Sequence, residues 1–542
     1  MAEGEKKVNR RSAIKAVGAG VAGLIVGGVI GSQAFPKEVV KEVTKTTTAR
    51  ETITKTIEKK VKPWIPEKWD EEHDVIVVGS GFAALAAAIE AKLAGADVLV
   101  IEKMPSPGGN SAINGGAVAA PGSDLQKKEG IEDSPELLYK DMLKAGLYIN
   151  HPELARTVAE NAWPAVKWTI EFLGVEYTPH LAWFGGHSVK RSYTTKIGSG
   201  WGIVSKELEK LEELGVEVRT NCKMTRIIRE GIAEGRVLGV EVREGYEFPD
   251  ETTGTIKYIK ARKAVVLGTG GFSQDVRLRM IQDPRLTEKV MSTNQPGATG
   301  EALLEALNIG ASPVQLSWIQ LGPWASPDEP GFGVAPFFAL FTKSYGIQVD
   351  PETGRRFMNE LGSRKECADA ILALGHYAVA ICDSDGYEKI PSMYREKIEE
   401  EGISKGVIRK FDTIEELAKA YNINLEGLKA EIERYNSLVE KGVDEDFGRP
   451  SAAMVEKIDT PPFYACRLWP KVHHCMGGVQ INTKAQVIDK WGNVIPGLYA
   501  AGEVTGGVHG ACRLGSVAVA DCLVFGRIAG KNAAKEPAWT QS

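Results

Sequence analysis

The sequence predicts an α/β fold built on a parallel sheet, and three observations support that prediction. The apolar run at residues 74–78 is typical of a strand buried on both faces. The turn Gly79-Ser80-Gly81 follows it directly, then an alanine-rich helix through Leu93 and a second apolar run at 97–101. A third apolar run, at 264–267, again ends in glycines. This alternation of strand, glycine turn and helix is the pattern of a doubly wound sheet.

Length and composition define the class of protein. At about 150 residues per domain, the 542 residues predict roughly three or four structural units. With 43% apolar and 25% charged residues, the chain is not a disordered, collagen-like or multi-span membrane protein. A net charge of −5 argues against nucleic acid as a partner.

The N-terminus has the pattern of an export signal. A basic stretch containing Arg10 and Arg11 precedes residues 16–36, which carry no charge. The paired arginines resemble a twin-arginine signal, which predicts a periplasmic location. We expect residues 1–36 to be this signal or, alternatively, an uncut anchor on the outer face of the membrane, since 21 uncharged residues can just span a bilayer. Residues 37–69 are expected to form a stalk or linker.

The first strand–turn–helix unit has the residues that bind a dinucleotide. Gly79 permits the tight turn, Gly81 lets the backbone approach a pyrophosphate, and the small Ala83 and Ala84 let helix and strand pack closely. The helix N-terminus favours phosphate. Glu102, at the end of the second strand, can accept hydrogen bonds from ribose hydroxyls. At this point either NAD or FAD is possible.

Later glycine-rich segments favour FAD. One loop covers residues 107–116, a second covers 294–301, and a third covers 497–504. Such loops let backbone amides lie against a flat ring system. Their occurrence near both ends of the chain predicts one cofactor wrapped by distant segments.

The seven cysteines indicate neither a metal site nor an internal haem. No two have C-x-x-C spacing, which argues against c-type haem, a zinc ribbon or an iron–sulfur cluster. We therefore expect no metal and mostly buried free thiols. Cys475 and Cys512 have no assigned role, and a redox or disulfide role for them is a minor alternative.

Two C-terminal segments carry a resemblance to a known family. Residues 472–478 read VHHCMGG, and residues 502–515 read GEVTGGVHGACRLG. Together with the glycine motifs they resemble the soluble fumarate reductase flavoproteins, a family that includes urocanate reductases and, more distantly, 3-ketosteroid dehydrogenases. The resemblance implies a Rossmann-like FAD-binding domain (residues 70–316 and 476–535) with an inserted α+β capping domain (residues 317–475).

The resemblance also implies the cofactor site. Asn110 stands where membrane-bound relatives attach FAD to a histidine, so we expect non-covalent FAD. The expected cofactor-binding residues are Gly79, Gly81, Ala83, Ala84, Glu102, Lys103, Gly108, Gly109, Asn110, Ser111, Gly115, Gly116, Met224, Gly270, Gly271, Thr299, Gly300, Glu301, Glu503, Ala518 and Val519.

Three residues are expected to act on the substrate. By resemblance, Arg364 is the proton donor in the reduction of a carbon–carbon double bond, and His474 and Arg513 bind a substrate carboxylate. A planar guanidinium binds both carboxylate oxygens and stabilises charge that develops on them. Each could instead have a purely structural role; for Arg364 this would be a salt bridge to Glu360.

The second carboxylate site of fumarate reductases is not recognisable. Gly322 stands in place of a histidine, no Thr-Glu pair follows, and Lys343 is a hypothetical substitute in the proton relay. The segment 318–341 is instead rich in aromatic residues, and the expected substrate pocket comprises Trp318, Trp324, Phe337, Phe338 and Phe341. An unpaired carboxylate there would cost several kcal/mol. The alternative is that these rings form the core of the capping domain.

We therefore expect a reductase of α,β-unsaturated monocarboxylates such as acrylate, methacrylate or an arylacrylate like cinnamate. The alternatives are a fumarate reductase proper, a 3-ketosteroid-type dehydrogenase, and an exported electron carrier without activity of its own. The chain has no haem motif. A separate c-type cytochrome or a quinol-linked donor is therefore implied, as in anaerobic respiration.

Overall fold

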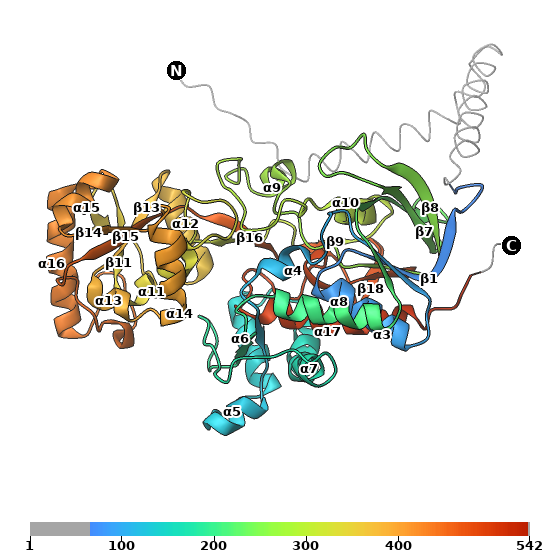
Figure 1. Cartoon of the computed structure of the whole chain (residues 1–542), viewed down its shortest axis with the longest axis horizontal. Coiled ribbons are helices and arrows are strands. Elements are labelled where there is room, and N and C mark those ends of the chain that lie inside the picture. The colour runs from blue at the N-terminus through green and yellow to red at the C-terminus, as the bar shows by residue number, and fades with distance from the viewer. Residues whose placement is uncertain (1–64, 540–542) are drawn as a thin grey trace, which may run out of the picture. The chain divides into compact units, whose positions relative to one another are not determined.

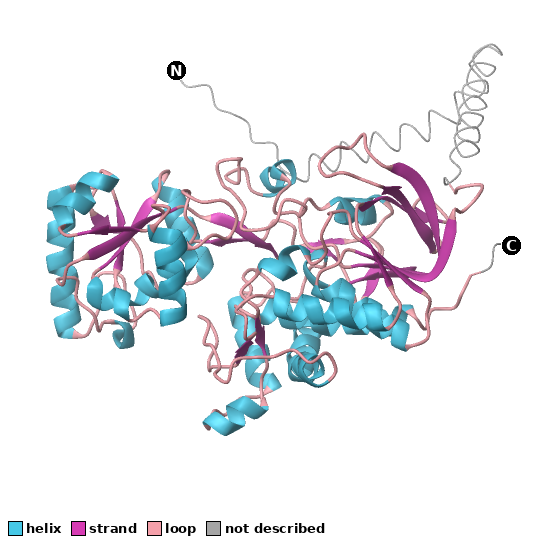
Figure 2. Ribbon diagram, viewed as in Figure 1, coloured by secondary structure: helices cyan, strands magenta, loops and turns pink. Residues whose placement is uncertain are grey.

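The computed structural model describes residues 65–539. The described residues all belong to one compact unit of the chain. The predicted signal or anchor and nearly all of the predicted stalk lie outside the described residues. Figure 2 shows that helices, strands and long loops alternate throughout the described part.

The predicted parallel sheet is confirmed. Its core contains the strands β1 (Glu71–Val78), β2 (Val98–Ile101), β5 (Glu217–Arg219), β8 (Thr255–Leu267) and β19 (Val494–Ala500). Along the sheet, β19, β8, β1, β2 and β5 are parallel neighbours. The final four residues of β1 are buried, because helices and loops cover both faces of the strand. The sheet contains eight strands, of which β18 (Gln486–Ile488), β7 (Val237–Glu244) and β6 (Cys222–Arg229) pair antiparallel.

Two helices pack tightly beside this sheet. The helix α3 (Phe82–Leu93) follows β1, and α17 (Val517–Ala533) packs along it (Figure 1). Any Cβ at Gly526 or Gly530 in α17 would lie within 2.5 Å of backbone atoms of α3. Glycine is therefore required at both positions for the two helices to approach this closely.

A second, five-stranded sheet has the strand order β12-β11-β13-β15-β14. These strands are β12 (Arg355–Arg356), β11 (Ile347–Asp350), β13 (Ala378–Cys382), β15 (Phe463–Leu468) and β14 (Arg409–Phe411). Neighbours within it are antiparallel, and every residue of β13 is buried. We call residues 317–475 the cap. Its sheet is covered by α11 (Ala335–Tyr345), α12 (Arg364–Leu374), α13 (Ser384–Glu388), α14 (Ser392–Lys397), α15 (Ile414–Tyr421) and α16 (Leu425–Lys441).

One two-stranded ribbon contains the start and the end of the cap. The strands β10 (Ile319–Gly322) and β16 (Lys471–Cys475) pair antiparallel, with Gln320 opposite His474. In Figure 1, β16 lies between the five-stranded sheet and the eight-stranded sheet. The ribbon therefore brings cap residues to the border of the cofactor-binding part.

The remaining elements surround the eight-stranded sheet or lie within loops. They are α4 (Gly109–Ile113), β3 (Ala117–Ala119), α5 (Asp124–Glu129), α6 (Pro135–Ala145), α7 (Pro152–Glu171), β4 (Ser192–Thr194), α8 (Trp201–Glu213), α9 (Val276–Gln282), α10 (Glu301–Asn308), β9 (Pro313–Val314), β17 (Gly478–Val479), the π-helical turn Ile398–Ile403, and the 3-10 turns Ser451–Ala453 and Gly502–Val504.

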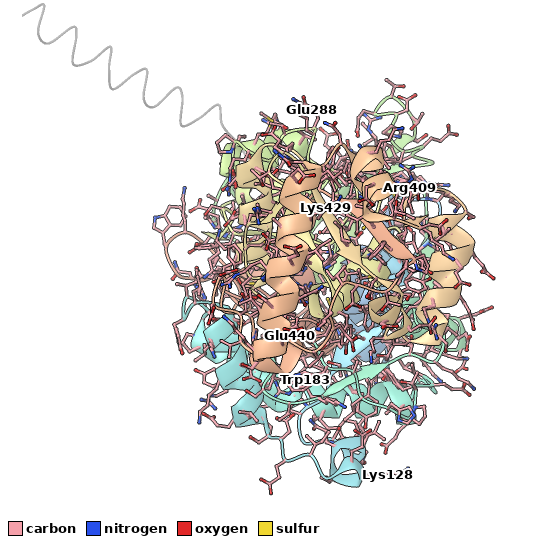
Figure 3. All side chains as sticks on the ribbon, turned by 90° about the vertical axis from the view of Figure 1, so that its left-hand side faces the viewer. Lys128, Trp183, Glu288, Arg409, Lys429 and Glu440 are labelled. Atoms are coloured by element: carbon pink, nitrogen blue, oxygen red, sulfur yellow. The ribbon has the colours of Figure 1, made fainter. Side chains whose placement is uncertain are left out.

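The outer end of the cap is charged. Lys429 and Glu440 project from α16, and Arg409 projects from β14 (Figure 3). Among the described residues, no helix has the length and apolarity needed to cross a membrane.

Candidate active site

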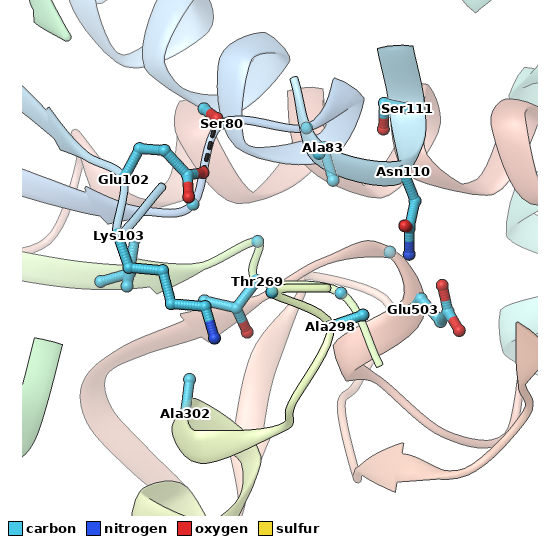
Figure 4. Close-up of a pocket in the computed structure, with 18 of the residues that line it drawn as sticks. Ser80, Ala83, Glu102, Lys103, Asn110, Ser111, Thr269, Ala298, Ala302 and Glu503 are labelled. Carbon is cyan, nitrogen blue, oxygen red and sulfur yellow. Dashed lines mark hydrogen bonds between the residues drawn. The ribbon is translucent and has the colours of Figure 1, made fainter. Parts of the chain in front are cut away.

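A deep cleft lies at the carboxyl ends of β1 and β2. It is lined by segments from Val78 to Cys522. Carboxyl ends of parallel strands are where α/β sheets bind ligands. Figure 4 shows Glu102 and Lys103 at one end of the cleft, and Asn110 and Glu503 at the other.

The turn after β1 is shaped for a close backbone approach. Gly79 has φ +98°, and a Cβ there would lie 2.6 Å from the Gly268 carbonyl oxygen. A Cβ at Gly81 would lie 2.9 Å from the Ser111 hydroxyl. Gly81 has no side chain that could cap α3, and the first amide of the helix, that of Phe82, donates to the Ser111 hydroxyl at 3.0 Å. The amides that follow Phe82 in the first turn are left to hold a pyrophosphate.

Charged side chains line the Glu102 end of the cleft. The Ser80 hydroxyl donates to Glu102 Oε2 at 2.6 Å, and the Met104 amide donates to Oε1 at 2.9 Å. Burial raises the pKa of Glu102 even though both hydrogen bonds oppose this shift. A carboxylate has about four acceptor sites, so Glu102 can still accept from ribose hydroxyls. At the same end of the cleft, Lys103 Nζ lies 2.9 Å from Glu301 Oε2 and also donates to Thr299.

The structure brings most of the predicted cofactor-binding residues into this cleft. Those that line it are Gly79, Gly81, Ala83, Glu102, Lys103, Gly108, Gly109, Asn110, Ser111, Met224, Gly270, Gly300, Glu301 and Glu503. Sequence reasoning missed Ser80, Thr269 and Gln295, which also line it. Ser80 could have been found, since it lies between the two glycines of the motif.

Other predicted residues support the cleft from behind or lie outside its lining. Ala84 packs against Gly268, where a Cβ would lie 2.7 Å from the Ala84 methyl group. At Gly271 a Cβ would lie 2.6 Å from Glu503 Oε1. Five more predicted residues are absent from the lining, namely Gly115, Gly116, Thr299, Ala518 and Val519, the last two in the first turn of α17.

These features fit FAD. The first turn of α3 suits a pyrophosphate, the Glu102 end suits a ribose, and α4 with Gly108 and Gly109 leaves backbone beside the opposite end. The Asn110 side chain accepts a 2.9 Å hydrogen bond from the Gln295 amide, which fixes its position at that opposite end.

Two groups predicted to bind substrate meet next to Glu503. His474 and Arg513 are both less than one-tenth exposed. His474 Nδ1 lies 3.6 Å from Glu503 Oε2. His474 Nε2 and Arg513 Nε are buried and have no hydrogen-bond partner among the described residues. Buried polar atoms are normally paired, so these two are available to a ligand.

Arg364 belongs to the same cluster. It is the first residue of α12, and its guanidinium lies 3.4 Å from Gln320 Oε1. The alternative salt bridge to Glu360 does not form, because Glu360 pairs with Arg356 at 2.8 Å in the cap interior. Burial lowers the pKa of Arg364, which makes its guanidinium a stronger acid than an exposed arginine.

Gln320 joins the two arginines. Its side-chain nitrogen donates to the Arg513 carbonyl oxygen and to Cys512 Sγ, both at 3.0 Å, while its oxygen accepts from Arg364. The sequence signal was its position two residues before Gly322. Gln320 reaches both arginines because the pairing of β10 with β16 sets it opposite His474. The sequence does not reveal this strand register.

The electrostatics favour a bound anion. Burial is the main cause that lowers the pKa of Arg513, to about 9, and the Arg364 charge adds to it. Burial and the same two arginines hold the pKa of His474 well below its usual range, so this imidazole is neutral at pH 7. A carboxylate placed here would relieve the repulsion between the two arginines.

Four of the five predicted aromatic residues, Trp324, Phe337, Phe338 and Phe341, pack in one apolar cluster of the cap, as the alternative interpretation expects. Trp324 also borders the cationic cluster: the Arg364 guanidinium is 5.9 Å from its ring, and the His473 ring is 5.0 Å away. Phe337 and Phe341 contact Tyr394, and Phe338 is fully buried in the cap core. Trp318 lines a separate pocket whose lining also includes Gln320 and Cys512.

The cysteines and Lys343 also have defined places. All seven cysteines are free thiols. Cys475 is buried, and its amide donates to Glu503 Oε1 at 2.8 Å. Burial, together with the Arg364 charge, lowers the pKa of Lys343. Among the described residues, no group of His, Cys, Asp and Glu side chains could hold a metal ion.

The chain is similar to known proteins in sequence. The family model described as an FAD binding domain matches residues 74–519. The chain is 45% identical to the acrylate reductase flavoprotein subunit of Shewanella woodyi, over 86% of this chain and 92% of that protein. It is 35% identical to the urocanate reductase of Eggerthella lenta, over 88% of this chain and 77% of that protein.

The fold agrees with these matches. The open conformation of a flavocytochrome c3 fumarate reductase superposes with a TM-score of 0.73 at 34% identity, covering 90% of this chain and 81% of that one. The chain therefore belongs to the family of FAD-binding oxidoreductases that contains the acrylate, urocanate and fumarate reductase flavoproteins.

Proposed function

We propose that this protein reduces the carbon–carbon double bond of α,β-unsaturated monocarboxylates, with acrylate and methacrylate as the simplest examples and arylacrylates in the same class. One observation carries the proposal: the buried cluster is cationic on one side and aromatic on the other. His474 and Arg513 offer unpartnered nitrogens to a single carboxylate. Trp324 closes the side facing Arg364.

A second carboxylate has no comparable partner at the aromatic side. Gly322 contributes no side chain, and the rings of Trp324, Phe332 and His473 lie together there. Burial and the two arginines keep the pKa of His473 well below its usual range, so it is not a cation at pH 7. Placing a carboxylate against these rings would cost several kcal/mol, which favours a substrate with one acidic end.

The residues divide the reaction between them. FAD, when bound, supplies the hydride. Arg513 and His474 hold the substrate carboxylate and stabilise the negative charge that develops on it during the reaction. The Arg364 guanidinium gives its proton to the α-carbon, and its lowered pKa assists this step. Lys343, a half-buried cation whose pKa is lowered by desolvation and by the Arg364 charge, is the proposed proton source for the next turnover.

A dye assay tests the proposal. Oxidation of a reduced viologen by the flavoprotein is followed with acrylate, methacrylate, cinnamate, urocanate and fumarate in parallel. We expect turnover with at least one monocarboxylate at a kcat/KM above that for fumarate. Fast turnover with fumarate alone would mean that a second anion site exists elsewhere, and the proposal would be wrong.

We further propose that FAD is held without a covalent bond, because Asn110 replaces the histidine that carries FAD in membrane-bound relatives. Acid precipitation should release all of the flavin into the supernatant. The proposed exported location and the separate cytochrome or quinol-linked electron donor are supported by the sequence of residues 1–36 and by the relative from Shewanella woodyi, whose printed name is that of a flavoprotein subunit.

A further inference from the structure

We infer that the indole of Trp324 sets the size of the substrate, and that it restricts the enzyme to small unsaturated acids with hydrogen or methyl substituents. This inference rests on the proposed function, and it narrows the proposed substrates to the smaller members of the class. It assigns a specificity-determining role to Trp324 together with the glycine beneath it, Gly322.

The indole occupies the space that a side chain at position 322 would need. A Cβ at Gly322 would lie 2.8 Å from Cη2, 3.0 Å from Cζ3 and 3.1 Å from Cζ2 of Trp324. Real Cβ atoms essentially never approach other atoms closer than 3.0 Å. The φ of Gly322 lies outside the left-handed region, so its backbone does not require glycine. The glycine is therefore needed because the indole lies on it.

The ring is held on its other sides as well. It is 5% exposed, and it contacts Phe332 at a centroid distance of 5.3 Å and His473 at 5.0 Å. His473 is fixed in turn by a 2.8 Å hydrogen bond to Thr293. A ring held from three sides cannot move aside cheaply to admit a larger ligand.

The distance to Arg364 limits what fits between them. The guanidinium carbon lies 5.9 Å from the centroid of the Trp324 ring. Non-bonded carbon atoms prefer separations of about 3.5–4.0 Å, so a flat ring inserted between the two groups would need about 7 Å. A phenyl substituent on the carbon that Arg364 protonates, or next to it on this side, would therefore collide with the indole.

The indole nitrogen gives a second, independent indication. Trp324 Nε1 is buried and has no partner among the described residues. A tryptophan that only fills a core normally pairs this N–H. A bound substrate or a water that reaches this N–H would supply the missing partner.

The test compares substrates within one enzyme sample. Wild type, Trp324→Leu and Trp324→Phe are assayed as FAD-loaded protein with reduced viologen, and kcat/KM is measured for acrylate and for cinnamate. The matched control is Trp469→Leu: Trp469 packs in the same cap core, and its Nε1 donates to the Lys289 carbonyl oxygen. The cinnamate-to-acrylate ratio does not depend on the fraction of folded enzyme, so a loss of stability alone leaves it unchanged.

We expect wild type to prefer acrylate at least about tenfold, and Trp324→Leu to raise the cinnamate-to-acrylate ratio at least about tenfold. Trp324→Phe should raise it less, and Trp469→Leu should not change it. A wild type that reduces cinnamate as well as acrylate, or an unchanged ratio in both Trp324 variants, would overturn the inference and leave the proposed function intact. Reduction of fumarate alone by wild type would instead reject the proposed function.

Discussion

At the scale of single residues, the site consists of three side chains, Arg364, His474 and Arg513, whose burial changes their acidity. Arg364 begins a helix of the cap, whereas Arg513 and His474 follow long stretches of buried chain. Each would have an ordinary pKa in water, and burial lowers the pKa of all three. The same burial that destabilises the unliganded site increases the affinity for a carboxylate.

Replacing Arg364 by glutamine should remove the proton donor. We expect kcat for acrylate reduction to fall about 10²–10⁴-fold, the usual contribution of general acid catalysis. The matched control is Lys365→Gln, because Lys365 is the next residue of α12 and pairs with Asp369 on the surface. Stopped-flow reduction of the flavin by dithionite should be the same in both variants. An equal loss of turnover in Lys365→Gln would contradict the assignment.

Gly322 and Trp324 should be energetically coupled. Gly322→Ala alone should lower kcat/KM for acrylate at least about tenfold, because the new methyl displaces the indole. In a Trp324→Leu background the same change should have little effect, because the clash is gone. A double-mutant cycle measures the difference, and additive effects would show that the two positions act independently.

At the scale of elements, the loop carrying Arg513 is held by a buried polar network. His187 Nε2 lies 2.8 Å from the Gly515 carbonyl oxygen, and its Nδ1 lies 3.0 Å from the Arg191 guanidinium. Arg191 is fully buried and pairs with Asp133 and Asp141. Since Arg191 can only donate, His187 Nδ1 accepts and Nε2–H donates, which requires a neutral imidazole.

This network gives a pH dependence with a definite sign. Burial, opposed by the bond to Gly515, lowers the pKa of His187 from 6.5 to about 4. The unfolded chain therefore binds a proton first as the pH falls, so His187 destabilises the fold progressively between about pH 6.5 and 4, by about 3 kcal/mol in total. His187→Gln should flatten this part of the stability–pH curve in denaturant titrations. His180→Gln, on an exposed part of the same segment, should leave the curve as in wild type.

Some helices, strands and site residues could be predicted from the sequence, and others could not. The runs at 74–78 and 97–101 predicted β1 and β2 because strands buried on both faces are continuously apolar. The glycine-rich turns predicted most of the residues that line the cleft, because a position where only glycine fits can be recognised in the sequence. Gln320 was missed because its contacts depend on strand register. The difference between Trp324 and Phe338 was missed because both are large apolar residues of one cap cluster, and only tertiary packing brings Trp324 next to Arg364 as well.

At the scale of the whole molecule, the cofactor cleft joins distant parts of the chain. Its lining runs from Val78 to Cys522, so a ligand that fills it stabilises most of the described fold at once. FAD at 100 times its Kd should add about 2.7 kcal/mol to the free energy of unfolding. We expect one cooperative thermal transition whose Tm rises with FAD concentration, and separate transitions with an unchanged Tm would contradict this.

Glu102→Ala should weaken FAD binding and so reduce the stabilisation of the fold by FAD. Loss of an acceptor for the ribose, and of the partner of Ser80, should cost about 1–3 kcal/mol of FAD binding. Titration of the apoprotein with FAD, followed by flavin fluorescence, measures the change in Kd. Glu129→Ala, an exposed carboxylate in α5, serves as the control and should bind FAD like wild type.

The ribbon of β10 and β16 has a consequence for how this enzyme can diversify. Ile319 and Cys475, at the two borders of the insertion, are paired neighbours, so the chain leaves and returns at one point. The cap can therefore be exchanged as a cassette between relatives without breaking the cofactor fold. Arg364, Trp324 and His474 would travel with the cassette, while Arg513 and the FAD cleft would remain. Chimaeras joined at this ribbon would inherit the FAD cleft and Arg513 from one parent, and substrate size with the other half of the carboxylate site from the other.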